Sequence, residues 1–289
     1  MIVKKADVLR DLVTNVFVAA GADDRNANVV AEHLVLANLS GVDTHGVIQG
    51  PLYVDSIRKK LIVPTAWPET IEERPTSVLV SGNWTFGQVA AKYTMEMVIK
   101  KAKEQGVAVG GLVQSNHIGR LGNFVEMATP QGLIAMVWGG GYGAETPVAV
   151  PFGGKERALH TNPLAFGFPL SDGNRMMFDF ATTALSGVKV ENARRRKESL
   201  PPGCIVDKEG NPSTDPEDFI SGGGALPFGG HKGYGLMMAA EYLGRIFTGA
   251  DEYADPSRGG PIFRRQGVSM IAFKADQFQA MANYKWRTG

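Results

Sequence analysis

The amino-acid sequence predicts an α/β fold in which a mixed sheet is flanked by helices. Short apolar runs bounded by glycine and proline lie in the middle of the chain, which is typical of buried strands. Segments with helical apolar spacing lie toward both ends, so we expect intertwined domains. Glycine is enriched, at 36 of 289 residues, and its clustering indicates tight turns or close approach of the backbone to a ligand.

The first third of the chain reads mainly as helix. In order, the patterns predict helix over 5–40 with a break at Gly21, helix over 51–60, strands over 70–72 and 77–80, and helix over 87–105 ending at Gly106. The break at Gly21 is followed by Asp23 and Asp24. Either aspartate can cap the second helix, because its carboxylate can accept a hydrogen bond from a free backbone N–H.

The rest of the chain alternates between strand and helix patterns. The predicted strands are 107–113, 133–138, 165–168, 176–180 and 268–273, and the predicted helices are 124–128, 181–196, 235–248 and 276–284. Turn residues without periodicity fill 201–216, which indicates a loop.

Composition excludes several classes of protein. The formal net charge is +1, so the concentrated basic face that a nucleic-acid or membrane-surface protein needs is not expected. A single cysteine, Cys204, rules out an intrachain disulfide framework and fits a reducing cytoplasm. The first residues show no signal-peptide pattern, and no apolar run reaches the roughly 18 residues that a membrane helix needs. We therefore expect a cytoplasmic protein with no nucleic-acid or membrane partner.

Five stretches place polar residues in glycine-rich or apolar settings. They are GVDTHG (41–46), QSNHIGRLGN (114–123), HTNPLAFGFP (160–169), FDFATT (178–183) and LPFGGHKGYGL (226–236). None matches a GxxxxGK[ST] phosphate loop, and no GxGxxG follows a first strand. The last stretch suits a pyrophosphate, because its glycines expose backbone N–H groups, Lys232 adds charge and a helix follows at once. A plain tight turn explains the same residues.

The histidines differ in their settings. His45 stands beside Thr44 and shortly after Asp43, which can orient its ring for proton transfer, although a helix-end residue bonding the backbone looks the same. His117 follows a strand, where α/β enzymes usually hold ligands, or it bonds a turn carbonyl. His33 lies on a helix face and is interpreted as structural. No HxxxH or HExxH spacing occurs, so we expect no metal site.

Two charged features remain. Asp179 lies within an apolar strand, and a carboxylate there needs partners: a ribose hydroxyl, a backbone ligand, a proton relay or a buried salt bridge. The basic run 194–197 is flanked by Glu191 and Glu198, so it is interpreted as a solvated face.

Taken together, the motifs resemble the type II malate/L-lactate dehydrogenase family, which also includes sulfolactate and ureidoglycolate dehydrogenases and cyclic imino-acid reductases. The resemblance runs from about residue 5 to about residue 275 and rests on motifs in one order: GVDTHG followed by PLYVDSIRKKLI, SNHIGRLGN, PFGGKERALHTNPLAFGFP, DFATTA, IVDKEGNPSTDP and LPFGGHKGYGL. It implies a nicotinamide-binding fold unlike the Rossmann fold, with NAD or NADP as cofactor, and a homodimer. It also implies a helical, dimer-forming region over 1–75 and 245–289, and a nicotinamide-binding mixed-sheet domain over 76–244.

The resemblance also implies roles for individual residues in interconverting a 2-oxo acid and a 2-hydroxy acid. His45 would be the proton donor to the carbonyl and Thr44 would orient it; the family more often has serine there. Some members use the histidine matching His117 as the acid/base, so both histidines are kept. Thr161 and Asn162 would line the substrate side. The implied cofactor contacts are His117, Ile118, Gly119, Arg120, Leu121, Asp179, Phe180, Ala181, His231, Lys232 and Gly233.

The chain departs from the family pattern in its expected pocket. Many members have an arginine four residues after the motif histidine, where it can grip the substrate carboxylate, but this chain has Gln49. We expect Gln49 to hydrogen bond the carboxylate and Arg120 to supply the missing charge, unless Arg120 meets solvent or a cofactor phosphate. His160 replaces the small residue usual before Thr-Asn-Pro. The chain also stops soon after Trp286, where members usually continue with a segment that helps enclose the cofactor.

Two other functions stay open. One is a cyclic imino-acid reductase, in which the hydride goes to a C=N bond. The other is a homologue that binds a nucleotide or an acid without turning it over, which Gln49 favours and the intact histidine motifs disfavour. The sequence leaves open NAD against NADP, the physiological substrate and its stereochemistry.

Overall fold

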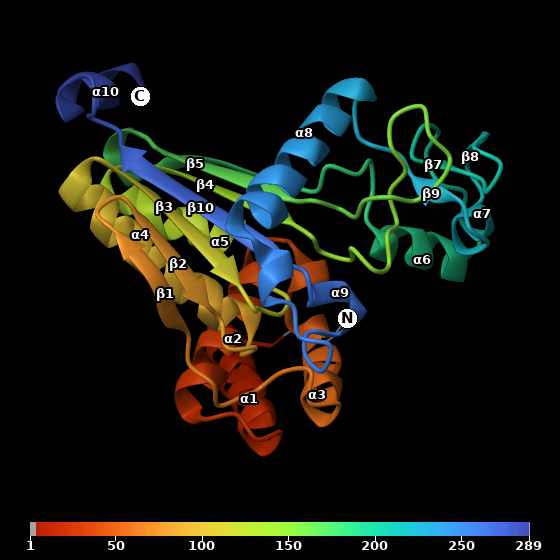
Figure 1. The fold of residues 1–289 in the computed structure, drawn as a ribbon, viewed down its shortest axis with the longest axis horizontal. Helices are drawn as coiled ribbons and strands as arrows, with labels where there is room; N and C mark the ends of the chain where they lie inside the picture. The colour runs from red at the N-terminus through yellow and green to blue at the C-terminus, as the bar shows by residue number, and fades with distance from the viewer. Residues whose placement is uncertain (1–3, 289) are drawn as a thin grey trace.

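A computed structural model describes residues 4–288. Its centre is a seven-stranded mixed sheet with the order β1-β2-β3-β10-β4-β5-β6, in which β2 and β3 are parallel and every other neighbouring pair is antiparallel. The strands are, in sheet order, β1 (Glu69–Arg74), β2 (Ser77–Ser81), β3 (Val107–Val113), β10 (Gly267–Lys274), β4 (Leu133–Gly140), β5 (Leu164–Pro169) and β6 (Arg175–Phe180). The predicted mixed sheet flanked by helices is confirmed (Figure 1).

Helices cover both faces of the sheet. On one face, α4 (Gly87–Gln105) and α5 (Gly122–Ala128) pack against the central strands in the main hydrophobic core. On the other face lie α8 (His231–Glu241) and the π-helical turn η5 (Tyr242–Ile246). Gly110 of β3 permits the close approach of α4, because a Cβ there would lie 2.5 Å from the Val98 side chain. On the next glycine, Gly111, a Cβ would lie 2.9 Å from the Leu79 side chain of the neighbouring strand β2.

The N-terminal helices form a second core at one end of the sheet (Figure 1). They are α1 (Ala6–Ala19), α2 (Asp24–Leu39) and α3 (Gly50–Arg58), joined by the 3-10 turns η1 (Asp43–His45) and η2 (Val47–Gln49). Phe17 of α1 and Tyr53 of α3 stack at 6.3 Å, and both pack on Phe86, the residue before α4. Asp23 caps α2 by accepting the Asn26 N–H at 2.8 Å. The short segments that carry His45 are therefore anchored to the sheet domain.

A smaller unit follows β6. It contains α6 (Gly187–Arg196), α7 (Pro216–Ile220) and a three-stranded sheet in the order β8-β7-β9, formed by β7 (Ile205–Val206), β8 (Pro212–Ser213) and β9 (Gly224–Ala225). It has its own apolar core. Figure 1 shows this unit at the right of the view, to the side of the large sheet. The remaining elements are η3 (Thr129–Gln131), η4 (Ser171–Gly173), η6 (Ala250–Tyr253), α9 (Gly260–Phe263) and α10 (Met281–Arg287).

Several sequence expectations are refined. β10 lies between β3 and β4 at the centre of the sheet, although the predicted division put 245–289 with the helical region. α6 begins at 187 and not at 181, because Ser186 caps it by accepting the Lys189 N–H. The short strands β7–β9 occupy the segment expected to be loop. Within residues 4–288, no helix combines the length and apolar character needed to cross a membrane.

Candidate active site

The GVDTHG segment holds His45 in a fixed turn between α2 and α3. The Asn38 side chain, on α2, donates to the Asp43 carboxylate at 2.5 Å and accepts the Val47 N–H at 2.9 Å. Gly46 is required here, because a Cβ would lie 2.3 Å from the Asn38 oxygen. His45 is thus presented by a turn that the end of α2 braces.

The neighbours of His45 orient its ring from one side. Thr44 Oγ1 lies 2.9 Å from His45 Nδ1, so the hydroxyl fixes the ring through that nitrogen. The Gln49 amide nitrogen donates to the Thr44 carbonyl at 2.7 Å, which uses one of its two N–H hydrogens. Burial lowers the pKa of His45 from its usual value. His45 is therefore neutral over more of the pH range than a free histidine.

His117 lies next to His45, with 5.5 Å between the ring centroids, and is held by a different chain of hydrogen bonds. Its Nδ1 is 2.6 Å from the Tyr53 hydroxyl, and Gln88 Nε2 donates to that hydroxyl at 2.8 Å. The hydroxyl accepts the Gln88 hydrogen, and His117 Nδ1 is its other hydrogen-bond partner among the described residues, so its own hydrogen goes to His117 Nδ1. His117 is then the neutral tautomer with its hydrogen on Nε2. Burial, with the charge of His45, lowers the pKa of His117 to about 3.

Buried contacts fix the loop 114–121 that carries His117. The Asn116 amide donates to the carbonyls of Trp84 and Thr85, both at 3.0 Å, and Gln266 donates to the Asn116 carbonyl at 2.9 Å. His33, predicted to be structural, accepts the Arg120 N–H on its Nε2 at 3.0 Å. Burial lowers the pKa of His33 to about 3, so it stays a neutral acceptor.

Arg120 is turned into the protein. Its guanidinium donates to Asn123 Oδ1 at 2.5 Å and pairs with Glu126 at 3.0 Å, and the side chain is only 4% exposed. Its charge is therefore largely matched inside the chain. The expectation that Arg120 binds the substrate carboxylate stays a prediction, and it requires the guanidinium to leave Glu126 or to share it. The side chains of Ile118 and Leu121 lie in the main core, so only their backbone groups are available to a cofactor.

The carboxylate of Asp179, which lies in an apolar strand, is hydrogen bonded to the backbone. Its carboxylate accepts the Gly122 N–H at 2.7 Å, which ties β6 to the start of α5. Burial raises the pKa of Asp179, and the Gly122 hydrogen bond and the nearby Arg120 oppose that change. Asp179 therefore joins two of the motifs that were singled out separately in the sequence.

Hydrogen bonds of Thr182 join the motif 178–183 to two further motifs, 160–169 and 226–236. Its N–H and its hydroxyl both donate to the Thr161 carbonyl, and its own carbonyl accepts the Phe228 N–H at 3.0 Å. Residues 226–228 therefore run beside 182–184 and lead directly into Gly229 and Gly230, which both have positive φ. α8 begins at the next residue. The motifs 178–183 and 226–236, which contain the predicted cofactor contacts 179–181 and 231–233, thus meet in space.

The remaining predicted residues differ in exposure. Asn162 is fully buried, and its amide donates to the Met237 carbonyl at 3.0 Å and to Glu241 at 3.1 Å, so it anchors α8. Its Oδ1 is buried and has no partner. Thr161 and Ala181 are half-buried, and His231 and Lys232 are exposed at the start of α8. Phe180 lies on the edge strand, at 37% exposed, with Phe228 at 5.5 Å.

Sequence reasoning missed four side chains beside the two histidines. Tyr53 and Gln88 hold His117, while Tyr142 and Phe263 lie at ring-centroid distances of 6.4 and 5.8 Å from it. The only sequence signal was that Tyr53 stands inside PLYVDSIRKKLI. Because Tyr53 lies in an apolar helical stripe, its pattern indicates core packing. Its partner His117 is 64 positions away, so the sequence does not indicate the hydrogen bond between them.

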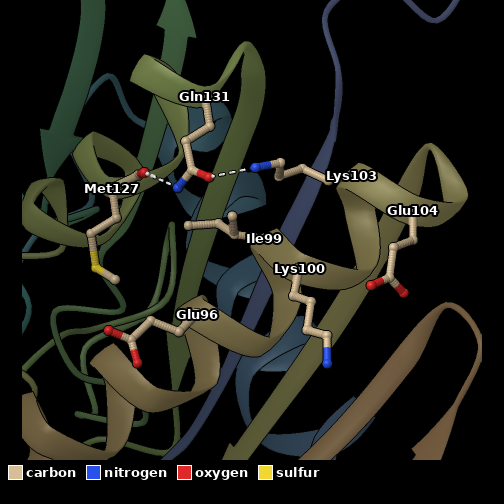
Figure 2. Close-up of a pocket in the computed structure, with 7 residues that line it drawn as sticks. All are labelled: Glu96, Ile99, Lys100, Lys103, Glu104, Met127 and Gln131. Atoms are coloured by element: carbon tan, nitrogen blue, oxygen red, sulfur yellow. Dashed lines mark hydrogen bonds between the residues drawn. The ribbon is translucent and has the colours of Figure 1, made fainter.

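We also searched the rest of the molecule for a metal site and for hollows in the surface. In residues 4–288, no group of three or more His, Cys, Asp or Glu side chains could hold a metal ion. An open hollow of about 550 Å³ lies on α4 near α5 and η3, and none of the candidate residues lines it. Figure 2 shows Gln131 at its edge, accepting from Lys103 at 3.3 Å and donating to the Met127 carbonyl at 3.1 Å. It is a surface groove away from the paired histidines.

Comparisons with known proteins define the class. The chain is similar to oxidoreductases, most of them named as dehydrogenases of hydroxy acids. More narrowly, it belongs to the malate/L-lactate dehydrogenase family, whose model matches residues 4–289.

Three relatives illustrate its range. An L-sulfolactate dehydrogenase from Methanocaldococcus jannaschii is 37% identical over 239 residues, 82% of this chain and 67% of the relative. The solved sulfolactate dehydrogenase from that organism superposes with a TM-score of 0.88 at 33% identity, covering 99% of this chain and 82% of the other. A ureidoglycolate dehydrogenase (NAD(+)) from Escherichia coli O157:H7 is 38% identical over 243 residues, 84% and 68% of the two chains. A solved delta1-piperideine-2-carboxylate reductase from Pseudomonas syringae has a TM-score of 0.88 at 30% identity, covering 100% and 86%.

Proposed function

We propose that this chain is an NAD- or NADP-dependent dehydrogenase that interconverts a small 2-oxo acid and its 2-hydroxy acid. One observation carries the proposal: two neutral histidines, His45 and His117, lie side by side and are held by different hydrogen-bond partners. Such a pair can give one oxygen atom of a substrate both a proton carrier and a fixed hydrogen-bond donor.

The segment leading into α8 fits a dinucleotide. Gly230 has φ 65° and precedes an eleven-residue helix whose first N–H groups have no helical partners, next to the exposed Lys232. Gly233 has no room for a side chain, because a Cβ would lie 1.7 Å from the Phe228 carbonyl oxygen. Together with 179–183, these residues would hold the cofactor's phosphates and ribose. When bound, the nicotinamide would supply or accept the hydride at the substrate carbon.

We assign the proton to His45. In oxidation of the hydroxy acid, neutral His45 takes the hydroxyl proton through Nε2, while Thr44 holds Nδ1. In reduction, protonated His45 returns that proton to the new alkoxide oxygen. His117 is a poor proton carrier near neutral pH, because its pKa is about 3. Its Nε2–H instead donates a hydrogen bond to the same oxygen.

The carboxylate of the substrate needs its own donors. Gln49 has one amide hydrogen left, Thr161 has a half-buried hydroxyl, and Asn162 positions the segment. Arg120 remains a candidate only if its pairing with Glu126 is shared. These mainly neutral donors would orient the acid by hydrogen-bond geometry more than by charge.

A second candidate is reduction of a cyclic imino acid, which the likeness to the piperideine-2-carboxylate reductase favours. The hydride acceptor would then be a C=N carbon, and His45 would manage a proton on nitrogen. We also propose that the chain acts as a homodimer, since Leu39, Ile48 and Leu52, which flank the His45 turn, are more than half exposed.

The pH dependence of kcat/KM in two variants tests the assignment. His45→Gln should lose about 100-fold or more in activity and also lose the acidic limb of the oxidation profile. His117→Gln should lower kcat and keep that limb, because the proton carrier is still present. If the acidic limb disappears in His117→Gln and persists in His45→Gln, the two roles are reversed.

A further inference from the structure

An aromatic wall lies beside His117. We define it as Tyr142, His160 and Phe263. Tyr142 lies 4.2 Å from His160, 5.3 Å from Phe263 and 6.4 Å from His117, all between ring centroids. The Gly143 N–H donates to the Ile262 carbonyl at 2.6 Å, which joins the loop after β4 to α9. The wall is thus built by three separate segments that meet beside the paired histidines.

Close packing of the wall depends on a glycine. Gly143 has φ 64°, and a Cβ there would lie 2.1 Å from His160. His160 is further oriented by Thr161, whose hydroxyl lies 3.3 Å from its Nδ1. The wall therefore adjoins Thr161, one of the residues expected on the substrate side.

The wall carries no charge at neutral pH. Burial lowers the pKa of His160 to about 4, so the ring is neutral. Burial raises the pKa of Tyr142 to about 12, so the phenol keeps its proton. With His117 also neutral, a ligand resting here meets aromatic and apolar surface.

The charged residues beside the wall neutralise one another. Arg264 and Arg265, which follow Phe263, both pair with Glu145, at 2.9 and 3.4 Å. Arg265 also pairs with Asp251 at 2.9 Å, and Arg245 links Asp251 to Glu241 at 3.0 and 3.2 Å. Three arginines thus face three carboxylates in one network. An anionic group arriving at the wall would have to take an arginine from a carboxylate that already holds it.

We propose that the substrate's side chain rests on this wall, and that the preferred substrates are 2-oxo and 2-hydroxy monocarboxylates with a branched or aromatic apolar side chain. The inference rests on the proposed function and specifies its substrate class. Burying a second anionic group against neutral rings removes it from water without a free cation. An apolar side chain gains about 25 cal/mol for each Å² that it buries.

A matched pair of substrates tests the proposal. The side chain of 4-methyl-2-oxopentanoate has nearly the shape of the oxaloacetate side chain but lacks its charge. We expect kcat/KM to be at least about tenfold higher for the apolar acid, a difference of about 1.4 kcal/mol. A preference for oxaloacetate overturns the proposal. If no acid in a panel of 2-oxo acids and cyclic imino acids is turned over with either coenzyme, the proposed function has failed, and calorimetric binding of 4-methylpentanoate against succinate then decides the wall's preference. Tighter binding of succinate also overturns it.

Variants locate the effect on the wall. Phe263→Ala should lower kcat/KM for 4-methyl-2-oxopentanoate more than for pyruvate, because pyruvate has only a methyl group to place on the wall. His160→Lys should raise the activity ratio of oxaloacetate to the apolar acid, because it adds a cation. Phe278→Ala, at a residue 98% exposed and outside the wall, serves as the control and should change neither ratio. Unfolding midpoints identify a variant that has lost its fold. A wall variant that folds and leaves both ratios unchanged contradicts the proposal.

Discussion

Replacement of Tyr53 by phenylalanine isolates the hydrogen-bond chain that sets the tautomer of His117. The hydroxyl is the only group removed, and it joins His117 Nδ1 at 2.6 Å to Gln88 Nε2 at 2.8 Å. Tyr53 is 3% exposed and Gln88 1%, so water does not readily replace the lost partner. His117 Nδ1 and the Gln88 amide each lose a partner at a cost of about 1–3 kcal/mol, so we expect the free energy of unfolding to fall by about 2–6 kcal/mol.

The same substitution should affect catalysis. Without the phenol, nothing described holds the hydrogen on Nε2 of His117, and the ring can present the wrong nitrogen to the substrate oxygen. We expect kcat to fall about 10- to 100-fold, equivalent to about 1.4–2.7 kcal/mol in the activation barrier. Denaturant unfolding measures the loss of stability, and steady-state kinetics at a temperature where the variant is folded measure kcat.

A second tyrosine provides the control. The hydroxyl of Tyr93 makes only a 3.5 Å contact with Thr70, so Tyr93→Phe should change the unfolding free energy by about 0.5 kcal/mol or less and leave kcat unchanged. The reasoning is refuted if Tyr53→Phe keeps both wild-type kcat and wild-type stability. A loss of stability with unchanged kcat would show that Tyr53 is structural and that the tautomer of His117 does not matter.

Three further predictions follow from the geometry. Arg120→Ala should lower the free energy of unfolding by about 3 kcal/mol, because it leaves the Glu126 carboxylate paired with Arg175 alone. A raised KM without a loss of stability would instead show that Arg120 binds substrate. Gly233→Ala should weaken coenzyme binding at least about tenfold in a fluorescence titration, whereas Gly235→Ala, with open space around its Cβ, should bind normally. Stability should fall as pH drops below the usual histidine pKa of about 6.5, because the unfolded chain then takes up protons that the native histidines refuse. Each such histidine lowers the free energy of unfolding by about 1.4 kcal/mol per pH unit until its native pKa is reached. Denaturant unfolding at several pH values measures this change. A free energy of unfolding that stays constant between pH 6.5 and pH 4 would contradict the neutral, buried state of His33, His117 and His160.

The sequence predicts most helices and strands because their periodic apolar patterns are local. The order of strands is not local. β10 is the last strand in the chain yet lies between β3 and β4, and nothing in residues 267–274 identifies those neighbours. The helix expected from 235 begins at 231. The sequence prediction placed its start too late because glycines in and just before its first turn are typical of loops. The very short strands β7–β9 have no pattern long enough to detect.

Contacts in the candidate site could be predicted where both residues belong to one motif. They could not be predicted where the partner lies far away in the sequence. The link between Thr44 and His45 joins neighbours in the sequence, so it could be predicted. Tyr53 reaches His117 only because α3 packs beside the loop after β3. The ion pair between Arg120 and Glu126, on the helix that starts just after the loop, could not be predicted from the sequence, and substrate binding by Arg120 stays a prediction.

Turnover of 2-oxo acids with His45 present and absent tests the central claim most directly. The wild-type chain should oxidise reduced NAD or NADP, followed by its absorbance, in the presence of at least one acid from a panel of 2-oxo acids and cyclic imino acids. His45→Ala should lose this activity and still bind the coenzyme. Wild-type activity retained in His45→Ala would contradict the account. So would coenzyme binding by the wild-type chain without turnover of any acid in the panel, which would indicate a homologue that binds without catalysis.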